Sequence, residues 1–410
     1  MKWPSDNPLH GLLILTTIPA HCPMWQVAPV SLVVAGIAGW VWARTTRRKS
    51  LGWAVATGLL FLAATDWALF ASLPRWGLSF GPVQPPWLGL VVLRGLVALL
   101  AAYVARRWRA TALTALALVQ VGISVLAVYG TTVEPFRTQV GRLAVSSAKL
   151  ADADTPLRIV QVSDLHVERL TRRERALPAL VAGLKPDLIV LTGDYLSTTY
   201  NRDPRALADL RWLLSQFHAP GGIFAVWGTS DVDHPELLRP MFAELGITPL
   251  EDRATEVTVS GHRLRLLGVT CNRGMVGDGQ RLSDLAAGVP AGAFTLLLYH
   301  SPDLMPKAAS LGIDLFLAGH THGGQCRVPG FGAVFTASRY WKRYEAGHYR
   351  QGNTDLYVSR GLGMEGFGAP RVRLFCPPEV VLVDLHGTGA CTQRISGPRP
   401  VPDGPTSSAP

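Results

Sequence analysis

Charged residues are scarce in this chain. Asp, Glu, Lys and Arg make up 17% of its 410 residues, whereas 48% are hydrophobic, an apolar balance for a protein that folds entirely in water. Acidic residues are scarcest at the start: residues 1–150 hold 3 Asp and Glu against 13 Lys and Arg, while residues 151–410 hold 26 of each kind. The net charge of +10 therefore belongs to the N-terminal part. The charge-balanced remainder lacks the basic field of a nucleic-acid-binding domain, so we expect no nucleic-acid partner.

Cysteine is sparse, and no internal repeat is present. The five cysteines have no zinc-site spacing, and their odd number predicts no particular disulfide framework. They are Cys22, Cys271, Cys326, Cys376 and Cys391. Because Cys326 has no evident basic partner, a packing role is favoured over a nucleophilic one. The absence of a repeat excludes solenoids and propellers.

Long apolar runs are what the N-terminal part does contain. A run at 11–20 is too short to span a bilayer and lacks the basic start and cleavage site of a signal peptide. Four longer stretches have about the length that a bilayer requires, namely 24–43, 53–73, 87–105 and 110–129. We therefore predict a transmembrane region of about four helices over residues 1–130, in a plasma or inner membrane.

The loops between these stretches predict an orientation. Residues 44–49 (RTTRRK) and 106–109 (RRWR) are basic, whereas the loop at 74–86 carries only Arg75. Short basic loops stay in the cytoplasm. The chain beyond residue 130 is thus expected on the extracytoplasmic side.

Two ionisable residues lie inside the predicted spans, where a lone charge is costly. Asp66 and Arg94 each lie about seven residues from the outer end of their span, which at helical rise places both roughly 10 Å deep. We predict an interhelical ion pair. In the alternative interpretation, Arg94 reaches the headgroups and Asp66 meets water.

From residue 157 the pattern changes to short apolar strands that alternate with helices. The stretches LRIVQVSDLH, DLIVLTGDY and GIFAVWGTSD each run from a strand into a polar turn, which predicts βαβ units and a sheet covered on its faces. We assign 157–386 to one globular domain and expect a hairpin at 255–270. Residues 131–156 form a linker in which some residues can pair as a strand, and 387–410, rich in Gly, Pro, Ser and Thr, form a disordered tail.

The predicted strand ends deliver metal-type ligands to one edge of the sheet, where α/β proteins bind ligands. These residues are Asp164, His166, Asp194, His300, His320 and His322. Residues two apart in an extended segment point the same way, so Asp164 with His166, and His320 with His322, are expected to present matched pairs to one pocket. Taken singly, a His at a strand end is usually a polar loop residue, and either aspartate could be a helix cap. All six at one edge by chance is improbable.

Two divalent cations held by two carboxylates and four neutral imidazoles leave a positive site that attracts phosphate. Paired metals can share a carboxylate and a hydroxide, and thereby activate water for attack on phosphorus. The imidazole-rich set suits Mn, Fe, Zn or Ni better than Mg. The predicted cofactors are therefore two divalent ions of that group.

The motifs DLH (164–166), GD (193–194), His300 and GHTHGG (319–324) resemble, in order and spacing, the calcineurin-like metallophosphoesterases. The stretch 357–385 is similar to the membrane-associated branch of that family, which includes lipid-precursor phosphohydrolases. The resemblance covers about residues 157–385. It implies a four-layer αββα sandwich, one metal held by Asp164, His166, Asp194 and His322, and a second held by Asp194, His300 and His320.

One motif departs from the family. Residues 228–231 read GTSD where the family has Gly-Asn-His followed by an acid, so Thr229 and Ser230 replace a metal-binding Asn and a His that assists the leaving group. The second metal is expected to bind more weakly. Nearby candidates for leaving-group assistance are Asp231, Asp233 and His234, but we assign no catalytic acid.

The other histidines have no such context and are interpreted as structural or solvated: His10, His21, His218, His262, His348 and His386. Arg360 and Arg373 could meet a substrate phosphate, although pairing within the fold is favoured.

These observations predict a membrane-embedded phosphoester hydrolase that uses metal-bound hydroxide, with a phospholipid or lipid-linked phosphoester as substrate because an anchored site samples a two-dimensional pool. Three alternatives stay open: a diesterase acting on soluble esters, a membrane-anchored binding or sensory protein with a degenerate site, and a transporter regulated by the domain. Four spans and a single buried charge pair weaken the last.

Overall fold

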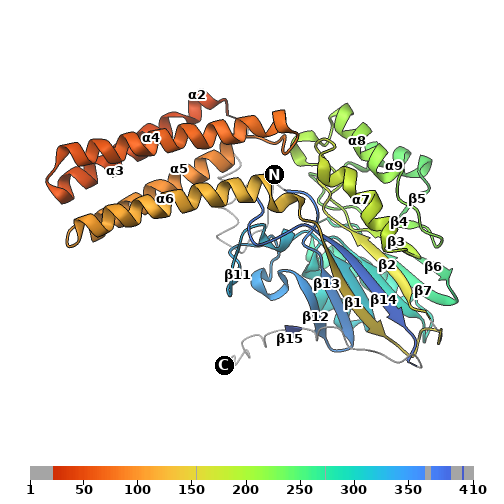
Figure 1. Cartoon of the computed structure of the whole chain (residues 1–410). Helices are drawn as coiled ribbons and strands as arrows, with labels where there is room; N and C mark the ends of the chain where they lie inside the picture. Colours follow the sequence, from red (N-terminus) through yellow and green to blue (C-terminus); the bar gives the residue numbers. More distant parts are fainter. Residues whose placement is uncertain (1–21, 154, 273, 365–370, 389–398, 401–410) are drawn as a thin grey trace, which may run out of the picture. The chain divides into compact units, whose positions relative to one another are not determined.

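The computed structural model describes residues 22–400 except 154, 273, 365–370 and 389–398, and it divides into two compact units. The N-terminal unit contains the described residues up to Glu134 together with 371–374, and the C-terminal unit contains Pro135–Met364 and the described residues from Phe375 onward. Figure 1 traces both units. His10, His21, Cys391 and most of the predicted tail at 387–410 lie outside the described residues.

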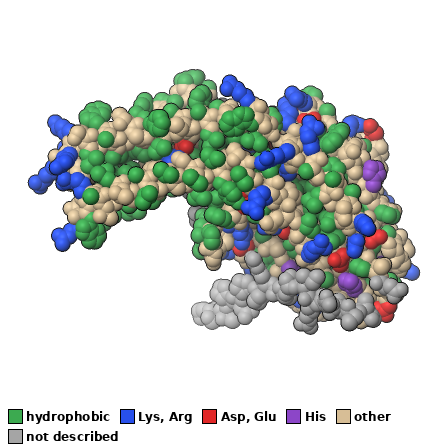
Figure 2. Space-filling view, viewed as in Figure 1, with side chains coloured by type: hydrophobic (Ala, Val, Ile, Leu, Met, Phe, Trp, Pro, Cys, Tyr) green, Lys and Arg blue, Asp and Glu red, His purple; other side chains and the backbone are tan. Residues whose placement is uncertain are grey.

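The N-terminal unit consists of long apolar helices: α2 (Met24–Val27), α3 (Pro29–Thr46), α4 (Lys49–Ser72), α5 (Gln84–Val104) and α6 (Arg109–Thr132). Four segments are long and apolar enough to cross a membrane, which agrees with the predicted number and positions of the spans. Figure 2 shows hydrophobic side chains along these helices, with Lys and Arg gathered at the end where α3 joins α4 and α5 joins α6.

Small residues allow α3 and α4 to pack closely. A Cβ atom on Gly39 would lie 2.7 Å from the carbonyl oxygen of Gly52, and one on Gly52 would lie 2.4 Å from that of Gly39. Any larger side chain at either position would separate the two backbones. Such small-residue contacts are typical of helix pairs in membranes, where no hydrophobic effect drives the helices together.

The predicted ion pair between α4 and α5 is confirmed. Arg94 donates from Nε to Asp66 Oδ2 at 2.7 Å and from Nη2 to Asp66 Oδ1 at 2.8 Å. Its remaining N–H groups reach the backbone and side-chain oxygens of Gln120, both at 3.0 Å, and Ser124 Oγ at 2.9 Å, so α6 joins the network. Arg94 is 1% exposed. The alternative, in which Arg94 extends to the headgroups, is therefore wrong.

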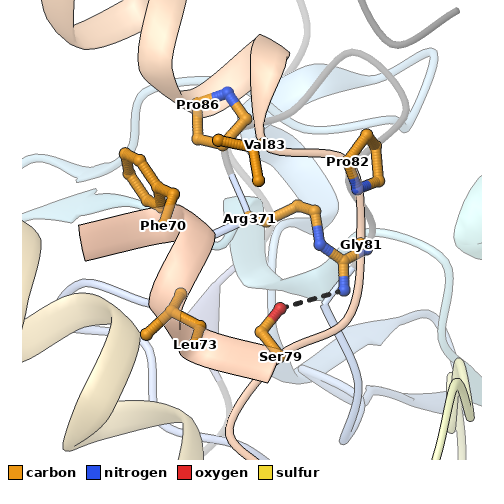
Figure 3. A pocket seen from close by; sticks show the side chains of 8 residues that line it. All are labelled: Phe70, Leu73, Ser79, Gly81, Pro82, Val83, Pro86 and Arg371. Carbon is orange, nitrogen blue, oxygen red and sulfur yellow. Dashed lines mark hydrogen bonds between the residues drawn. The ribbon is translucent and has the colours of Figure 1, made fainter. Parts of the chain in front are cut away.

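A short C-terminal segment also belongs to the N-terminal unit. Arg371 lies in a pocket lined by Phe70, Leu73, Ser79, Gly81, Pro82, Val83 and Pro86 (Figure 3). Its Nη2 donates to Ser79 Oγ at 3.4 Å, and burial lowers the pKa of its guanidinium to about 10. Nearby, the backbone N–H of Arg373 donates to the carbonyl of Gly130 on α6 at 2.9 Å. The sequence pattern had grouped these residues with the globular domain.

The C-terminal unit is built on two sheets. One has the strand order β1-β14-β2-β3-β4-β5, and the other has the order β15-β12-β13-β9-β8-β7-β6. The strands of the first sheet are β1 (Gln139–Ser146), β2 (Leu157–Val162), β3 (Leu188–Leu191), β4 (Ile223–Ala225), β5 (Ile247–Pro249) and β14 (Glu379–His386). Those of the second are β6 (Arg253–Val259), β7 (His262–Gly268), β8 (Phe294–Leu298), β9 (Leu315–Ala318), β12 (Gly347–Gln351), β13 (Thr354–Val358) and β15 (Arg399–Pro400).

Helices cover the outer faces of both sheets. On the first sheet lie α7 (Arg172–Gly183), α8 (Pro204–Leu214) and α9 (Pro235–Glu244), and on the second α10 (Met275–Ala287) and α11 (Met305–Ser310). Between the sheets, Val190 on β3 and Leu296 on β8 belong to one buried cluster. The central strands are apolar on both faces because each is covered on both sides. The unit is thus the predicted four-layer αββα sandwich.

Two segments differ from a simple domain followed by a tail. Within the predicted linker, β1 pairs in parallel with β14 over eight residues, so that part of 131–156 belongs to the sheet. Within the predicted disordered tail, β15 pairs with β12 over two residues. The hairpin predicted at 255–270 is confirmed as β6–β7, which turns at Ser260 and Gly261, both with positive φ.

Candidate metal centre

The candidate ligands follow the carboxyl ends of four parallel strands. Asp164 and His166 follow β2 and Asp194 follows β3, in the first sheet; His300 follows β8, and His320 and His322 follow β9, in the second. The two sheets meet at this edge, so strands far apart in the chain deliver side chains to one place. The structure brings all six residues together in two overlapping groups.

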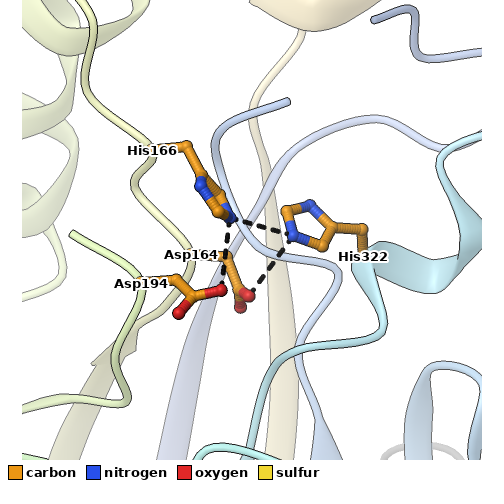
Figure 4. A group of neighbouring side chains, drawn as sticks. All are labelled: Asp164, His166, Asp194 and His322. Carbon is orange, nitrogen blue, oxygen red and sulfur yellow. Dashed lines mark hydrogen bonds and ion pairs between the residues drawn. The ribbon is translucent and has the colours of Figure 1, made fainter. Parts of the chain in front are cut away.

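The first group contains Asp164, His166, Asp194 and His322 (Figure 4). Their possible ligand atoms all lie within 4.8 Å of one another. His166 Nε2 lies 3.1 Å from His322 Nε2 and 3.5 Å from Asp194 Oδ2, and His322 Nε2 lies 3.4 Å from Asp164 Oδ1. All four side chains are buried.

The second group contains Asp194, His300 and His320. His300 Nε2 lies 3.2 Å from Asp194 Oδ2 and 3.1 Å from His320 Nδ1. Asp194 Oδ2 therefore faces a histidine of each group, and this carboxylate joins the two. The neighbours His320 and His322 divide between the groups, so the turn that carries them can serve two ions.

The reason for this convergence is not the predicted one. The sequence suggested extended segments, but φ is positive at five of the six residues: Asp164 (50°), His166 (41°), Asp194 (56°), His320 (69°) and His322 (51°). Left-handed backbone is uncommon for any residue except glycine, although Asp and His adopt it more often than most, and it persists where the surroundings hold it. It turns each side chain back towards the site directly after its strand. The expectation of matched extended pairs was therefore wrong, although the six residues do lie together.

Two glycines make room for the shared carboxylate. Gly193 has a φ of 92°, and a Cβ there would lie 2.4 Å from Gly228 Cα and 3.0 Å from His300 Nδ1. A Cβ on Gly228 would lie 2.2 Å from Asp194 Oδ1. The backbones of the loops after β3 and β4 therefore pack directly against each other around Asp194, with no room for a Cβ atom between them.

Asp233 was considered in the sequence only as a candidate for leaving-group assistance. In the structure it is 2% exposed, and both its oxygens accept backbone N–H groups. Oδ2 accepts from Asp194 at 2.9 Å and from Gly228 at 2.7 Å, while Oδ1 accepts from Tyr195 at 2.9 Å. Burial, together with the charge of Asp194, raises the pKa of Asp233 to about 7. This residue positions the backbone that carries Asp194.

The two unusual residues of the 228–231 motif differ in burial. Thr229 is buried, its backbone N–H donates to Asp194 Oδ1 at 2.6 Å, and its hydroxyl lies 3.5 Å from Asp194 Oδ2. Ser230 is exposed. His234 is half-buried, and its Nδ1 lies 3.7 Å from Glu236. The threonine hydroxyl therefore contacts the shared carboxylate.

His300 shows directly that the site suits cations. Its Nδ1 lies 2.7 Å from the carbonyl oxygen of Thr192, which can only accept, so Nδ1 carries a hydrogen. Nε2 then faces the carboxylate of Asp194 at 3.2 Å, a contact that is favourable when a proton or a metal ion lies between the two atoms. Anchoring the remote nitrogen to a carbonyl is how metal-binding histidines are usually oriented.

The pKa shifts point the same way. Burial alone would lower the pKa of His300, but the charge of Asp194 and its hydrogen bond outweigh burial and raise it to about 10. Burial opposes ionisation of Asp194, yet the neighbouring His300 and His166 hold its pKa well below the usual range. Positive charge is favoured at the centre, and the donor set fits divalent metals.

Two of the remaining sequence candidates pair with carboxylates outside these groups. Arg360 donates to Glu379 Oε1 at 2.9 Å, which confirms the favoured pairing within the fold. His348 Nε2 lies 2.7 Å from Asp355 Oδ1. Cys376 was not singled out in the sequence, yet its thiol donates to the carbonyl of His322 at 3.2 Å and supports the ligand turn.

Two buried, nitrogen-rich groups joined by one carboxylate, at the sheet edge of an αββα sandwich, are typical of metal-dependent hydrolases of phosphoesters. Comparison with known proteins identifies the family. Residues 157–324 match the model of the calcineurin-like phosphoesterases. The phosphodiesterase YaeI of Escherichia coli is 32% identical over 240 residues, which cover 57% of this chain and 84% of YaeI. The chain therefore belongs to the calcineurin-like metallophosphoesterases and is a phosphoester hydrolase.

Two further relatives extend over a similar share of the chain. The metallophosphoesterase YkuE of Bacillus subtilis is 28% identical over 271 residues, covering 63% of this chain and 90% of YkuE. The UDP-2,3-diacylglucosamine pyrophosphatase LpxG of Chlamydia trachomatis is 26% identical over 310 residues, covering 62% of this chain and 92% of LpxG.

Proposed function

We propose that this chain hydrolyses a lipid or lipid-linked phosphoester at a binuclear metal centre. One ion is held by Asp164, His166, Asp194 and His322, and the other by Asp194, His300 and His320. The observation that carries the proposal is the position of Asp194 Oδ2, within 3.5 Å of His166 Nε2 and 3.2 Å of His300 Nε2. When bound, two divalent ions supply Lewis-acid charge to the phosphoryl group and acidify water.

The protein's own groups orient this centre. Thr192 fixes the ring of His300 through Nδ1, and Asp233 fixes the backbone of Asp194. The backbone N–H of His320 donates to Asp164 Oδ1 at 3.0 Å, which ties the ligand turn after β9 to the loop after β2. Ligands held in this way need little rearrangement when charge develops on the phosphorus group, and such preorganisation is a main source of rate enhancement.

A membrane-held substrate is supported by two observations. Four helices of the N-terminal unit are long and apolar enough to span a bilayer. One relative, LpxG, is named for the hydrolysis of a diacylated sugar nucleotide. A chain held in the bilayer meets lipid phosphoesters at high local concentration. The exposed Ser230, which stands where the family has a histidine, favours substrates whose leaving group needs little protonation.

Metal content and turnover together test the proposal. The purified full chain is expected to contain two equivalents of Mn, Fe, Zn or Ni by elemental analysis, to hydrolyse bis(p-nitrophenyl) phosphate and a lipid phosphoester, and to lose both activities after chelation. Readdition of metal should restore them. Two bound metals without turnover on a panel of lipid and soluble phosphoesters would instead favour the binding or sensory protein that the altered 228–231 motif allows.

We also infer that the catalytic unit lies outside the cytoplasm, because the basic α3–α4 and α5–α6 connections gather at one end of the helices (Figure 2). An accessible tag in the loop near residue 46 and another at residue 410 are expected to react from opposite sides of the membrane. Reaction of both tags from the cytoplasmic side would contradict this orientation and would direct the substrate search to intracellular precursors.

A further inference from the structure

A small hairpin follows the ligand turn in the C-terminal unit. Its strands are β10 (Arg327–Val328) and β11 (Gly332–Ala333), paired antiparallel. Large apolar side chains on the hairpin and just after it are exposed to solvent: Val328 (48%), Phe331 (55%), Val334 (53%) and Trp341 (38%). We call these four residues the apolar patch.

The hairpin has an inner and an outer face. Alternate residues of a strand point to opposite sides. Arg327 and Ala333 face inward, where Arg327 Nη2 donates to Glu345 Oε1 at 2.8 Å and the Ala333 N–H donates to Glu345 Oε2 at 2.9 Å. Val328 is on the other side of β10, and Val334 directly follows β11. Their exposure is therefore set by the register of the hairpin and by the buried Glu345.

One cationic side chain contacts the apolar patch, and two more lie close to Trp341 in the sequence. The ammonium of Lys342 lies 3.6 Å from the ring centroid of Phe331 and donates to the carbonyl of Ala333 at 3.2 Å. Arg339 is exposed and Arg343 is half-buried. The one carboxylate of this segment, Glu345, is buried. Exposed aromatic and aliphatic groups beside cations complement the interface of an anionic bilayer, where rings enter the headgroup layer and cations meet phosphate.

The hairpin is tied firmly to the metal centre. Arg327 Nη1 donates to the carbonyl of Gly323 at 3.0 Å, and Thr321 Oγ1 donates to the carbonyl of Glu345 at 2.8 Å. A Cβ on Gly324 would lie 2.4 Å from the carbonyl oxygen of Phe335. These contacts join the hairpin to the turn that carries His320 and His322. A binding partner that contacts the hairpin would therefore also fix the position of the turn that carries His320 and His322.

We propose that the apolar patch inserts into the interface of an anionic bilayer and presents the metal centre to lipid headgroups. The role in presenting substrate rests on the function proposed above, whereas the insertion does not. The proposal assigns to this chain a second membrane contact, on the catalytic unit itself, in addition to the spanning helices. The contact would favour phosphoesters at the depth of the headgroups over those dissolved in water.

Amide hydrogen exchange tests the insertion without using activity. The full chain is placed in nanodiscs of phosphatidylcholine alone or with phosphatidylglycerol. Exchange of residues 328–341 is expected to slow several-fold with the anionic lipid, while exchange of α10 stays unchanged. The triple variant Phe331→Ser, Val334→Ser, Trp341→Ser should show no such difference. Equal exchange of the wild-type segment in both nanodiscs would overturn the proposal.

Turnover provides the second readout. The triple variant is expected to hydrolyse a lipid phosphoester about 10-fold or more slowly relative to a soluble diester than the wild type does, because buried ring and aliphatic area is lost. The matched control carries Trp212→Ser and Val276→Ser, which are 39% and 89% exposed and lie outside the patch. It should keep the wild-type ratio. Absence of any turnover in the wild type would refute the proposed function, yet leave the exchange result to decide the insertion.

Discussion

Replacing Asp194 with asparagine is expected to remove both metals and to lower kcat by about 10³-fold or more. Removing even one group that stabilises developing charge commonly costs about 10²–10³-fold, and Asp194 belongs to both ligand groups. The amide keeps the shape of the side chain but loses the negative charge that two cations would share. Elemental analysis and steady-state turnover of a soluble diester measure the two effects.

A matched control is Asp203→Asn. Asp203 caps α8 by accepting from the N–H of Ala206 at 2.8 Å and lies away from the ligand groups. Asparagine caps a helix about as well as aspartate, so the variant loses chiefly the ion pair with Arg169 and should lower stability by no more than about 1 kcal/mol, while metal content and turnover stay near wild type. Thermal unfolding of both variants separates ligand loss from misfolding. A folded Asp194→Asn variant that retains two metals and normal turnover would show that the binuclear assignment is wrong.

The identity of the candidate ligands was predictable because strand ends are visible in the sequence. The apolar runs of β2, β3, β8 and β9 are each followed by a polar candidate ligand. Parallel strands bring their carboxyl ends to one edge of a sheet. The local geometry was not predictable. Asp and His adopt left-handed backbone more often than most other residues, but whether Asp164 or His322 does so depends on the loops that pack around it.

The positioning residues were harder to find for a related reason. Asp233 acts through backbone N–H groups of residues about 38 positions earlier in the chain, so neither spacing nor residue type marks its role. The sequence allowed for a strand in the predicted linker but did not locate β1, whose apolar pattern is weak because an edge strand is only partly buried. Contacts made across a long sequence separation are what the pattern of one chain reveals least.

The ion pair between α4 and α5 shows what the sequence reveals and what it does not. Asp66 and Arg94 were predicted as partners because an isolated charge in a span is costly and both lie at one depth. Gln120 and Ser124 were not, since neutral polar residues in an apolar run are common enough to carry no such signal. Yet these two residues accept hydrogen bonds from the N–H groups of Arg94 that do not donate to Asp66, and they link α6 to α4 and α5.

Removing one partner of this network is expected to destabilise the N-terminal unit strongly. Arg94→Met leaves the Asp66 carboxylate buried without its counter-charge, at a cost of about 3–5 kcal/mol in the free energy of unfolding. Asp66→Leu leaves the guanidinium of Arg94 with Gln120 and Ser124 alone and should cost a similar amount. The double variant is expected to cost less than the sum of the two, because no uncompensated charge remains.

The test measures the free energy of unfolding of the full chain in detergent or bilayers. It compares both single variants, the double variant and Ser124→Ala. Ser124→Ala removes one neutral acceptor and should cost only about 1 kcal/mol, which separates the effect of charge from that of a lost hydrogen bond. If the costs of the two single variants simply add in the double variant, Asp66 and Arg94 do not interact.

Because the N–H groups of Arg94 all donate to Asp66, Gln120 and Ser124, the network offers no donor to a passing solute. It therefore favours a structural anchor over the transporter alternative, and solute flux through the wild-type helices should stay at background.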